Sequence, residues 1–264
     1  MTRSVPLCAL ALLMAAPASA DIFEIAAANR ASGATDTPAT VPYIHTADVT
    51  VSGRKGDEVQ DPVTARLRID PSQPPGERVS VLSRSDADSE EMNTALADLI
   101  EQIEENDLED QRDGFWCSAR DRGDFAVTPA NYAVIGESDG IVRLEPTPDR
   151  RVQLMMGEDD LDELDGQERG IAKRLADRLE GELHLDASDG QMRGMAFRMT
   201  RPLRVMLIAK VKAMDVAVEC DRAPNGYPYV SRFSMHVTAG AFGRDMVNDM
   251  EIVVGELTPV GSDS

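Results

Sequence analysis

Apolar side chains at every second position mark the carboxyl-terminal third of the chain, from about Leu179 to Leu257. Leu183 and Leu185, for example, alternate with Glu182 and His184. A period of two is typical of a β-strand that buries one face. Short turns rich in Gly, Pro, Asn and Asp separate these segments. The pattern therefore predicts a meander of four or five antiparallel strands instead of parallel βαβ units.

The apolar face of this meander is rich in methionine, which is flexible and polarizable and suits surfaces that accept varied apolar ligands. The residues expected to line such a ligand site are Met195, Phe197, Met199, Met214, Val216, Phe233, Met235, Met250 and Ile252. The alternative is that these side chains simply fill a core packed against helices. The sequence leaves both interpretations open.

Alternation also predicts strands earlier in the chain. They are Tyr43–Ser52, Val63–Ile69, Arg78–Ser83, Tyr132–Ile135, Ile141–Leu144 and Val152–Met156. Turn residues at 53–57 and 70–76 separate the first three, and turn residues at 137–140 separate the fourth from the fifth. Residues 22–25 can begin either a strand or a short helix.

Two segments have helical periodicity. Ser89 can cap a helix that runs to about Glu105, with acidic residues in its first turn and an apolar stripe that includes Leu96 and Ile103. A second helix is predicted from about Glu168 to Leu179. Together the elements predict a mainly β (α+β) fold, with one curved antiparallel sheet and two or three helices. Residues 21–264 are short enough for one domain.

The first twenty residues have the features of a cleavable export signal. Arg3 supplies a positive start, and the apolar run from Leu7 to Ala16 is too short to span a bilayer. Ala18-Ser19-Ala20 fits the cleavage rule, so we expect cleavage after Ala20 and a soluble periplasmic protein. Cys8 lies inside the apolar run instead of after small residues, which disfavours a lipoprotein signal.

The formal net charge of −20 excludes some partners. Nucleic acid phosphates and plain anionic membrane surfaces would be repelled. A need for solubility, or adaptation to a salty habitat, is enough to explain this net charge.

Two cysteines, Cys117 and Cys220, follow the predicted signal. An even number of cysteines in an oxidising compartment favours a disulfide. The alternative is two buried thiols that behave as small apolar groups.

No motif in the chain carries a named chemistry. His45, His184 and His236 are scattered, and metal-site spacings such as His-Glu-x-x-His or Cys-x-x-Cys do not occur. Neither a nucleophile elbow nor a glycine-rich phosphate loop is present. We therefore expect no metal, no cofactor and no catalytic residue, and we predict that the protein is not an enzyme.

Three short features carry a resemblance to a known family. They are Leu179-Glu180-Gly181-Glu182-Leu183, an Asp and Gly turn, and a strand that ends in Arg201-Pro202-Leu203. With the order of elements from Val49 to Leu257, they resemble the periplasmic lipoprotein-carrier (LolA-like) unclosed β-barrel group and related exported bacterial proteins. The resemblance implies an incomplete barrel with helices on its concave side and a cavity for acyl chains.

Two functions follow from these expectations. The first is a non-enzymatic periplasmic protein that binds or carries a lipid or a lipoprotein acyl chain. The alternative is an envelope interaction or structural protein whose barrel is filled by its own side chains. The sequence does not reveal the oligomeric state.

Overall fold

The computed structural model of the chain describes residues 21–31, 41–74, 76–105, 115–117, 126–156, 166–204, 209–241 and 244–261. The predicted export signal lies outside these ranges. Eleven strands form one sheet: β1 (Tyr43–Lys55), β2 (Glu58–Ile69), β3 (Val79–Ser85), β4 (Tyr132–Ser138), β5 (Ile141–Pro146), β6 (Leu179–Asp186), β7 (Met192–Met199), β8 (Leu203–Arg204), β9 (Ala209–Arg222), β10 (Pro228–Ala241) and β11 (Arg244–Pro259). The described helices are α1 (Asp21–Ala31), α2 (Glu90–Glu105), α4 (Pro148–Met156) and α6 (Gly166–Ala176).

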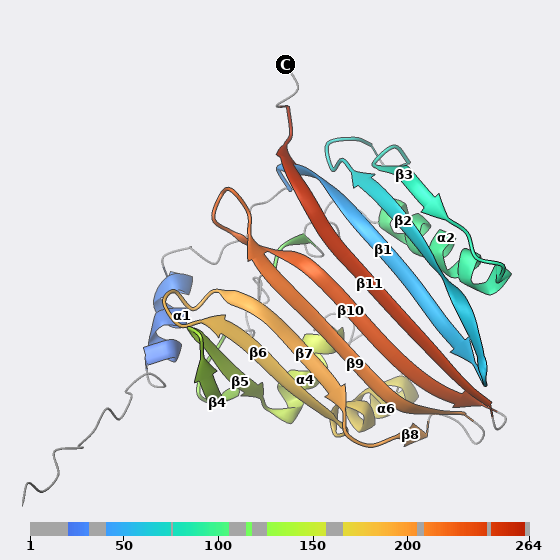
Figure 1. The fold of residues 1–264 in the computed structure, drawn as a ribbon. Coiled ribbons are helices and arrows are strands. Elements are labelled where there is room, and N and C mark those ends of the chain that lie inside the picture. Colours follow the sequence, from blue (N-terminus) through green and yellow to red (C-terminus); the bar gives the residue numbers. More distant parts are fainter. Residues whose placement is uncertain are drawn as a thin grey trace, which may run out of the picture.

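The sheet follows the order β3-β2-β1-β11-β10-β9-β7-β6-β5-β4, with β8 paired to β9 off this path. Every pairing is antiparallel. The first strand therefore pairs with the last, β1 with β11, and the two ends of the order lie on opposite sides of the molecule (Figure 1). The predicted mainly β fold, a curved antiparallel sheet that does not close, is confirmed.

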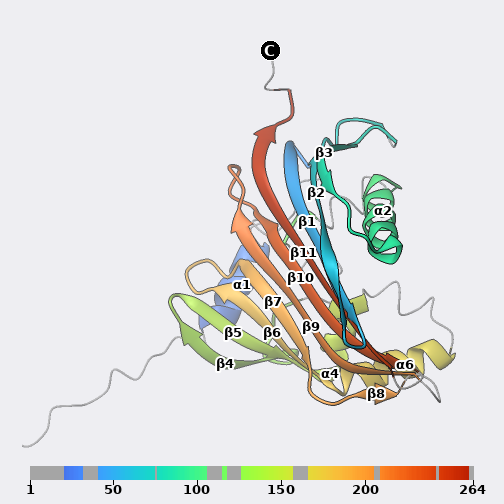
Figure 2. The same ribbon diagram turned by 45° about the vertical axis from the view of Figure 1, so that its right-hand side comes forward.

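Buried and exposed positions alternate along β2 because one face of the sheet packs against α2. Val63, Ala65 and Leu67 are buried, whereas Thr64 and Arg66 between them are more exposed. The face with Val63 forms one core with Met92 and Leu96 of α2. Figure 2 shows α2 beside β2 and β3.

The predicted helix from Ser89 to Glu105 is confirmed as α2. The Ser89 carbonyl accepts the N–H of Asn93 at 3.2 Å, and the Ser89 hydroxyl lies 3.4 Å from the N–H of Met92. Ser89 thus caps the first turn, where free N–H groups need acceptors.

The predicted strand Val152–Met156 is wrong, since these residues end helix α4. The helix starts one turn earlier, where the Thr147 carbonyl accepts the N–H of Arg151 at 3.0 Å. Pro148 takes the first helical position, where it has no N–H to leave unpaired, and Asp149 follows in the first turn. A short apolar run does not distinguish a strand from a helix. The helix start signal at Thr147-Pro148 therefore determines that this segment is helical.

The second predicted helix is confirmed as α6, but its end differs. The helix stops at Ala176, and Leu179 opens β6. The N–H groups of Asp177 and Arg178 bond back to carbonyls of the last turn, at 3.0 and 2.8 Å. Leu179 therefore belongs to the strand alternation with Leu183 and not to the helical stripe.

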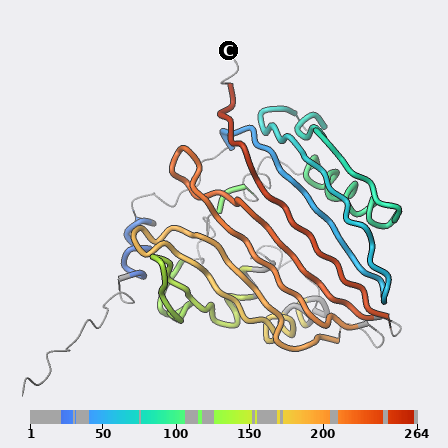
Figure 3. The backbone as a smooth tube through the Cα atoms, in the orientation of Figure 1, coloured from blue at the N-terminus to red at the C-terminus, as the bar shows by residue number. Residues whose placement is uncertain are grey.

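The hairpin of β1 and β2 extends beyond its predicted ends. Gly53, Arg54 and Lys55 still pair with both β2 and β11, and the turn lies at Gly56-Asp57. The segment at 22–25 forms part of helix α1. Figure 3 shows α1 beside the turn that joins β6 to β7.

Candidate ligand-binding face

The strand register assembles an apolar row across the helix-facing side of the sheet. Each member lies directly opposite the next on the neighbouring strand. From β2 to β5 the row is Ala65, Val49, Ile252, Phe233, Val218, Met195, Leu183 and Leu144. Eight successive strands thus present apolar side chains at one level of the same face.

A second row lies two residues further along the strands. It is Val63, Val51, Met250, Met235, Val216, Phe197 and Gly181. Because alternate residues of a strand face the same way, both rows share one face. Met199 and Met214 lie on the same face and pack with Leu175 of α6. All nine residues predicted as a ligand lining therefore share the helix-facing side.

Burial along these rows is uneven. At one flank, Val49, Val51 and Val63 are buried with α2. At the other flank, Leu144 and Leu183 are buried with Ile22 of α1, and Leu154 of α4 packs against them. The middle of the rows stays partly exposed: Ile252, Met250, Phe233, Met235 and Val216. The described helices thus close the flanks of this face more completely than its centre.

A cluster of aromatic rings lies near one end of β1 and β10. Phe115 stacks on Tyr229 with ring centroids 5.6 Å apart, and it meets Trp116 edge to face at 4.8 Å. His45 tilts against Phe115 at 4.8 Å. Burial lowers the pKa of His45 to about 4, although a weak hydrogen bond between its Nδ1 and the Tyr43 carbonyl opposes this shift.

The predicted disulfide joins Cys117 to Cys220 of β9 across a Cα–Cα distance of 6.0 Å. The N–H of Cys117 also bonds the carbonyl of Pro228 at 3.0 Å. Segment 115–117 is therefore fixed to the sheet by a covalent bond, a backbone hydrogen bond and ring contacts. Sequence reasoning did not predict where the aromatic residues of this segment pack.

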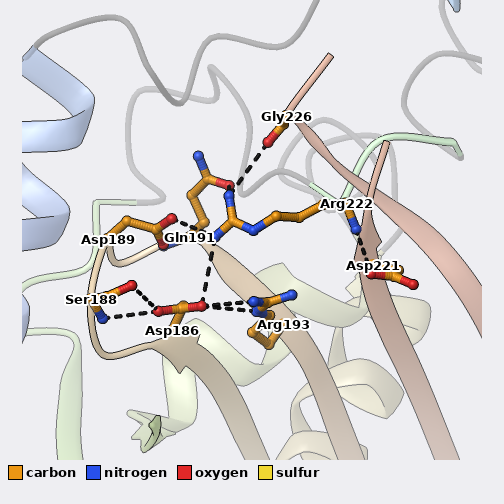
Figure 4. Close-up of polar contacts among 8 residues, drawn as sticks. All are labelled: Asp186, Ser188, Asp189, Gln191, Arg193, Asp221, Arg222 and Gly226. Atoms are coloured by element: carbon orange, nitrogen blue, oxygen red, sulfur yellow. Dashed lines mark hydrogen bonds and ion pairs between the residues drawn. The ribbon is translucent and has the colours of Figure 1, made fainter. Parts of the chain in front are cut away.

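Ion pairs connect the β6–β7 turn to the end of β9 (Figure 4). The Arg193 guanidinium donates to Oδ2 of Asp186 at 2.8 and 3.1 Å. Arg222 pairs with Asp189, donates to Oε1 of Gln191 at 2.7 Å and lies 3.6 Å from Asp186. Two arginines thus balance two aspartates at a turn whose Gly190 lies against Ala26 of α1.

Local hydrogen bonds favour the charged form of Asp186. Its Oδ1 accepts the Ser188 hydroxyl at 2.5 Å and the Ser188 N–H at 2.9 Å. These bonds, with the Arg193 contacts, hold the pKa of Asp186 well below its usual range despite partial burial. The network joins the β6–β7 turn to the end of β9 and so holds these turns together.

The opposite side of the sheet is polar and contains a hollow of about 630 Å³ that sequence reasoning missed. One row of its lining, from β1 to β6, is Thr50, Glu251, Ser234, Ala217, Ala196 and Glu182. The second row is Ser52, Asp249, His236, Asp215, Arg198 and Glu180. The hollow depends on which small residues lie opposite each other, and a single sequence does not state that register.

Two other kinds of site are not found in the described part of the chain. Among the described residues, no group of three or more His, Cys, Asp or Glu side chains is placed to hold a metal ion. In the same ranges, no helix has the length and apolar content needed to cross a membrane.

Comparisons with known proteins give weak likenesses. No family model and no curated protein matches the chain. The chain is similar to the solved structure of a LolA superfamily protein from Nitrosomonas europaea, with 13% identity, 92% of this chain and 94% of that chain covered, and a TM-score of 0.25. It is also similar to the MucA/MucB complex of Pseudomonas aeruginosa, with 12% identity, coverage of 90% and 99%, and a TM-score of 0.20. TM-scores this low do not place the chain in either group.

Proposed function

We propose that the chain is a non-enzymatic exported protein that binds an apolar ligand, such as a lipid or a lipoprotein acyl chain, on the helix-facing side of its sheet. One observation carries this proposal. The apolar rows are continuous across the sheet, yet their middle remains partly exposed between two buried flanks. Partly exposed apolar surface of this kind is stabilised when a ligand covers it.

The chemistry of the central strip suits an elongated apolar ligand. Phe233 offers a flat ring, while Met235 and Met250 offer unbranched, polarizable side chains that adapt to different shapes. No charged residue belongs to the two rows from β2 to β7. Binding there would depend on burial of apolar area, so the site would discriminate poorly among chains of similar thickness.

The export component rests on separate support. The predicted signal ends at Ala20, and the Cys117–Cys220 disulfide belongs to a class of bond that persists in oxidising compartments such as the periplasm.

The first experiment is lipid extraction and mass spectrometry on the mature chain, purified from a periplasm without detergent. We expect a lipid in stoichiometric amount. Binding of a fluorescent fatty-acid probe is then compared between the wild type and a Phe233→Ala/Met235→Ala variant, for which we expect about tenfold weaker binding through lost apolar contact.

The matched control is Val253→Ala on β11. Val253 lies directly opposite Arg232, on the polar side of the sheet, and is 36% exposed. The substitution removes apolar area without touching the proposed site, so the affinity for the probe should not change. A protein that carries no lipid and fails to bind the probe would contradict the proposal.

The edge strand β3 favours a second candidate, an interaction protein of the cell envelope. Val81 and Leu82 are 49% and 53% exposed, although both are apolar. Leu82 is left unpaired where the register between β2 and β3 shifts. An exposed apolar edge strand can pair with a strand of another protein. If Val81→Lys/Leu82→Lys abolishes a measured protein–protein association while probe binding is absent, the second candidate replaces the first.

A further inference from the structure

The hollow on the polar side of the sheet plays no part in the function proposed above. It crosses six strands, β1, β11, β10, β9, β7 and β6, in the middle of the sheet. Twelve of its lining residues alternate with the apolar rows and face away from the helices. Each of the other four lies between two of these along its strand and belongs to the second apolar row: Phe197, Val216, Met235 and Met250.

Small side chains form the floor of the hollow. Ala196, Ala217 and Ser234 lie side by side on β7, β9 and β10. A solvated strand face accepts larger residues such as Thr, Val or Tyr without difficulty, so the fold itself does not require these small ones. The hydroxyls of Ser234, Thr50 and Ser52 make no hydrogen bond within the described part of the chain. They are therefore available to the polar groups of a guest.

Negative charge collects at two ends of this floor. In the middle, Asp215 is neutralised by Arg198 at 2.8 Å. Toward β11, Glu251 is likewise neutralised, by Arg232 with an Nε–Oε1 distance of 2.7 Å. Both pairs leave little net charge at their own positions.

Glu180 and Asp249 are the lining carboxylates without an arginine or lysine partner among the described residues. Glu180 on β6 has no ion-pair partner among the described residues. Glu182 beside it forms an ion pair with Arg143 at 3.8 Å and also bonds His184 at 3.2 Å. Asp249 on β11 bonds His236 at 2.6 Å, and a histidine compensates a carboxylate only when it is protonated.

We propose that this hollow binds an extended, positively charged polypeptide segment of a partner protein, which lies across the strands with one basic side chain near Glu180 and another near Asp249. The small floor admits a backbone, the free hydroxyls offer it hydrogen bonds, and the two acidic ends complement two cations. The net charge of −20 on the whole chain also attracts cationic partners over long range and speeds their association.

The distance between the acidic ends sets the spacing of the guest. From β6 to β11 the sheet order passes four strand intervals, or about 19 Å at about 4.8 Å each. An extended chain advances about 3.3 Å per residue, so the two basic residues should be about six positions apart. An even spacing also turns both side chains to the same side of the guest strand.

The test is fluorescence anisotropy with the mature full chain and labelled seven-residue peptides of Ser and Thr that carry two lysines. We expect the peptide with terminal lysines to bind, more weakly as salt rises, and to bind several-fold better than one with adjacent lysines. A peptide with terminal glutamates should not bind. Equal affinity for both lysine peptides, or no binding of either, overturns the proposal.

Variants separate a built site from general charge attraction. Ala217→Phe fills the floor, and Glu180→Gln/Glu182→Gln removes one acidic end. Each should weaken binding about tenfold. The control Glu101→Gln/Glu105→Gln removes the same charge from exposed positions on α2 and should leave binding within about twofold. If the control weakens binding as much as the variants do, the hollow is not the site. If Ala217→Phe does not fold, the comparison of Glu180→Gln/Glu182→Gln with the control Glu101→Gln/Glu105→Gln still tests the proposal.

Discussion

The buried imidazole of His45 makes the stability of the protein depend on pH. Its pKa falls from 6.5 to about 4 on folding because the charged ring loses water against Phe115. Between these values the unfolded chain holds a proton that the folded chain rejects, so acid favours unfolding. The contribution of His45 to the unfolding free energy should be complete above about pH 6.5. It should be lost as the pH drops toward 4, which lowers the unfolding free energy by about 3 kcal/mol in total.

Urea unfolding at a series of pH values measures this effect, with His45→Asn as the variant that should lose it. His184→Gln, on the polar side of β6, is the control that should retain it. A wild-type protein whose unfolding free energy stays level from pH 7 to pH 4.5 would show that His45 is not the group responsible.

Arg222 tests the ion-pair network at the β6–β7 turn. Its guanidinium holds Asp189 and Gln191, and its side chain is 33% exposed. Arg222→Ala leaves these groups with fewer partners, and we expect a loss of about 1–2 kcal/mol in unfolding free energy. Arg232→Ala breaks a more exposed pair with Glu251 and should cost less than Arg222→Ala does. Equal losses in thermal unfolding would mean that the network adds nothing beyond a surface pair.

At the scale of the element, one glycine allows an aromatic ring to cover a neighbouring strand. A Cβ on Gly181 of β6 would lie 2.7 Å from Cε1 of Phe197 and 3.3 Å from Cγ of Pro146. Phe197 is buried, so its ring has little room to move. Gly181→Ala should therefore destabilise the fold by about 1–3 kcal/mol through overpacking.

A second glycine gives the matched control, because the same substitution should act in the opposite direction there. A Cβ on Gly170 of α6 meets nothing within 4 Å. Alanine favours a helix over glycine by about 0.5–1 kcal/mol, so Gly170→Ala should raise the melting temperature. If both variants shift the melting temperature in the same direction, the close approach of Phe197 does not explain the effect of Gly181→Ala.

Sequence periodicity was enough to predict the faces of the strands but not their neighbours. The alternation around Phe233 and Met235 assigned them to the apolar side because that pattern depends on one strand alone. The hollow required Ala217 to lie opposite both Ala196 and Ser234, and such pairing depends on register across strands. The helix at Val152–Met156 was missed for a different reason, since its start signal lies outside the apolar run.

At the scale of the whole molecule, the pairing of β1 with β11 joins distant parts of the chain, and the Cys117–Cys220 bond adds a second long-range connection. The bond spans 103 residues. A closed loop of that size removes much of the freedom of the unfolded chain, which corresponds to about 4–5 kcal/mol of stability in the chain-entropy model. The surrounding ring contacts remain when the bond is broken, so reduction should weaken the fold without removing the aromatic cluster.

Cys117→Ala/Cys220→Ala should accordingly lower the unfolding free energy by about 4 kcal/mol in urea titrations, while near-ultraviolet circular dichroism from Trp116 persists in the folded state. A reductant should lower the unfolding free energy of the wild type toward that of the variant and leave that of the variant unchanged. This comparison separates loss of the bond from other effects of the reductant. The outcome that contradicts this is an equal midpoint for the oxidised and reduced wild type. In that case the pairing of β1 with β11 and the packing of Phe115 and Trp116 would already restrict the chain as much as the bond does.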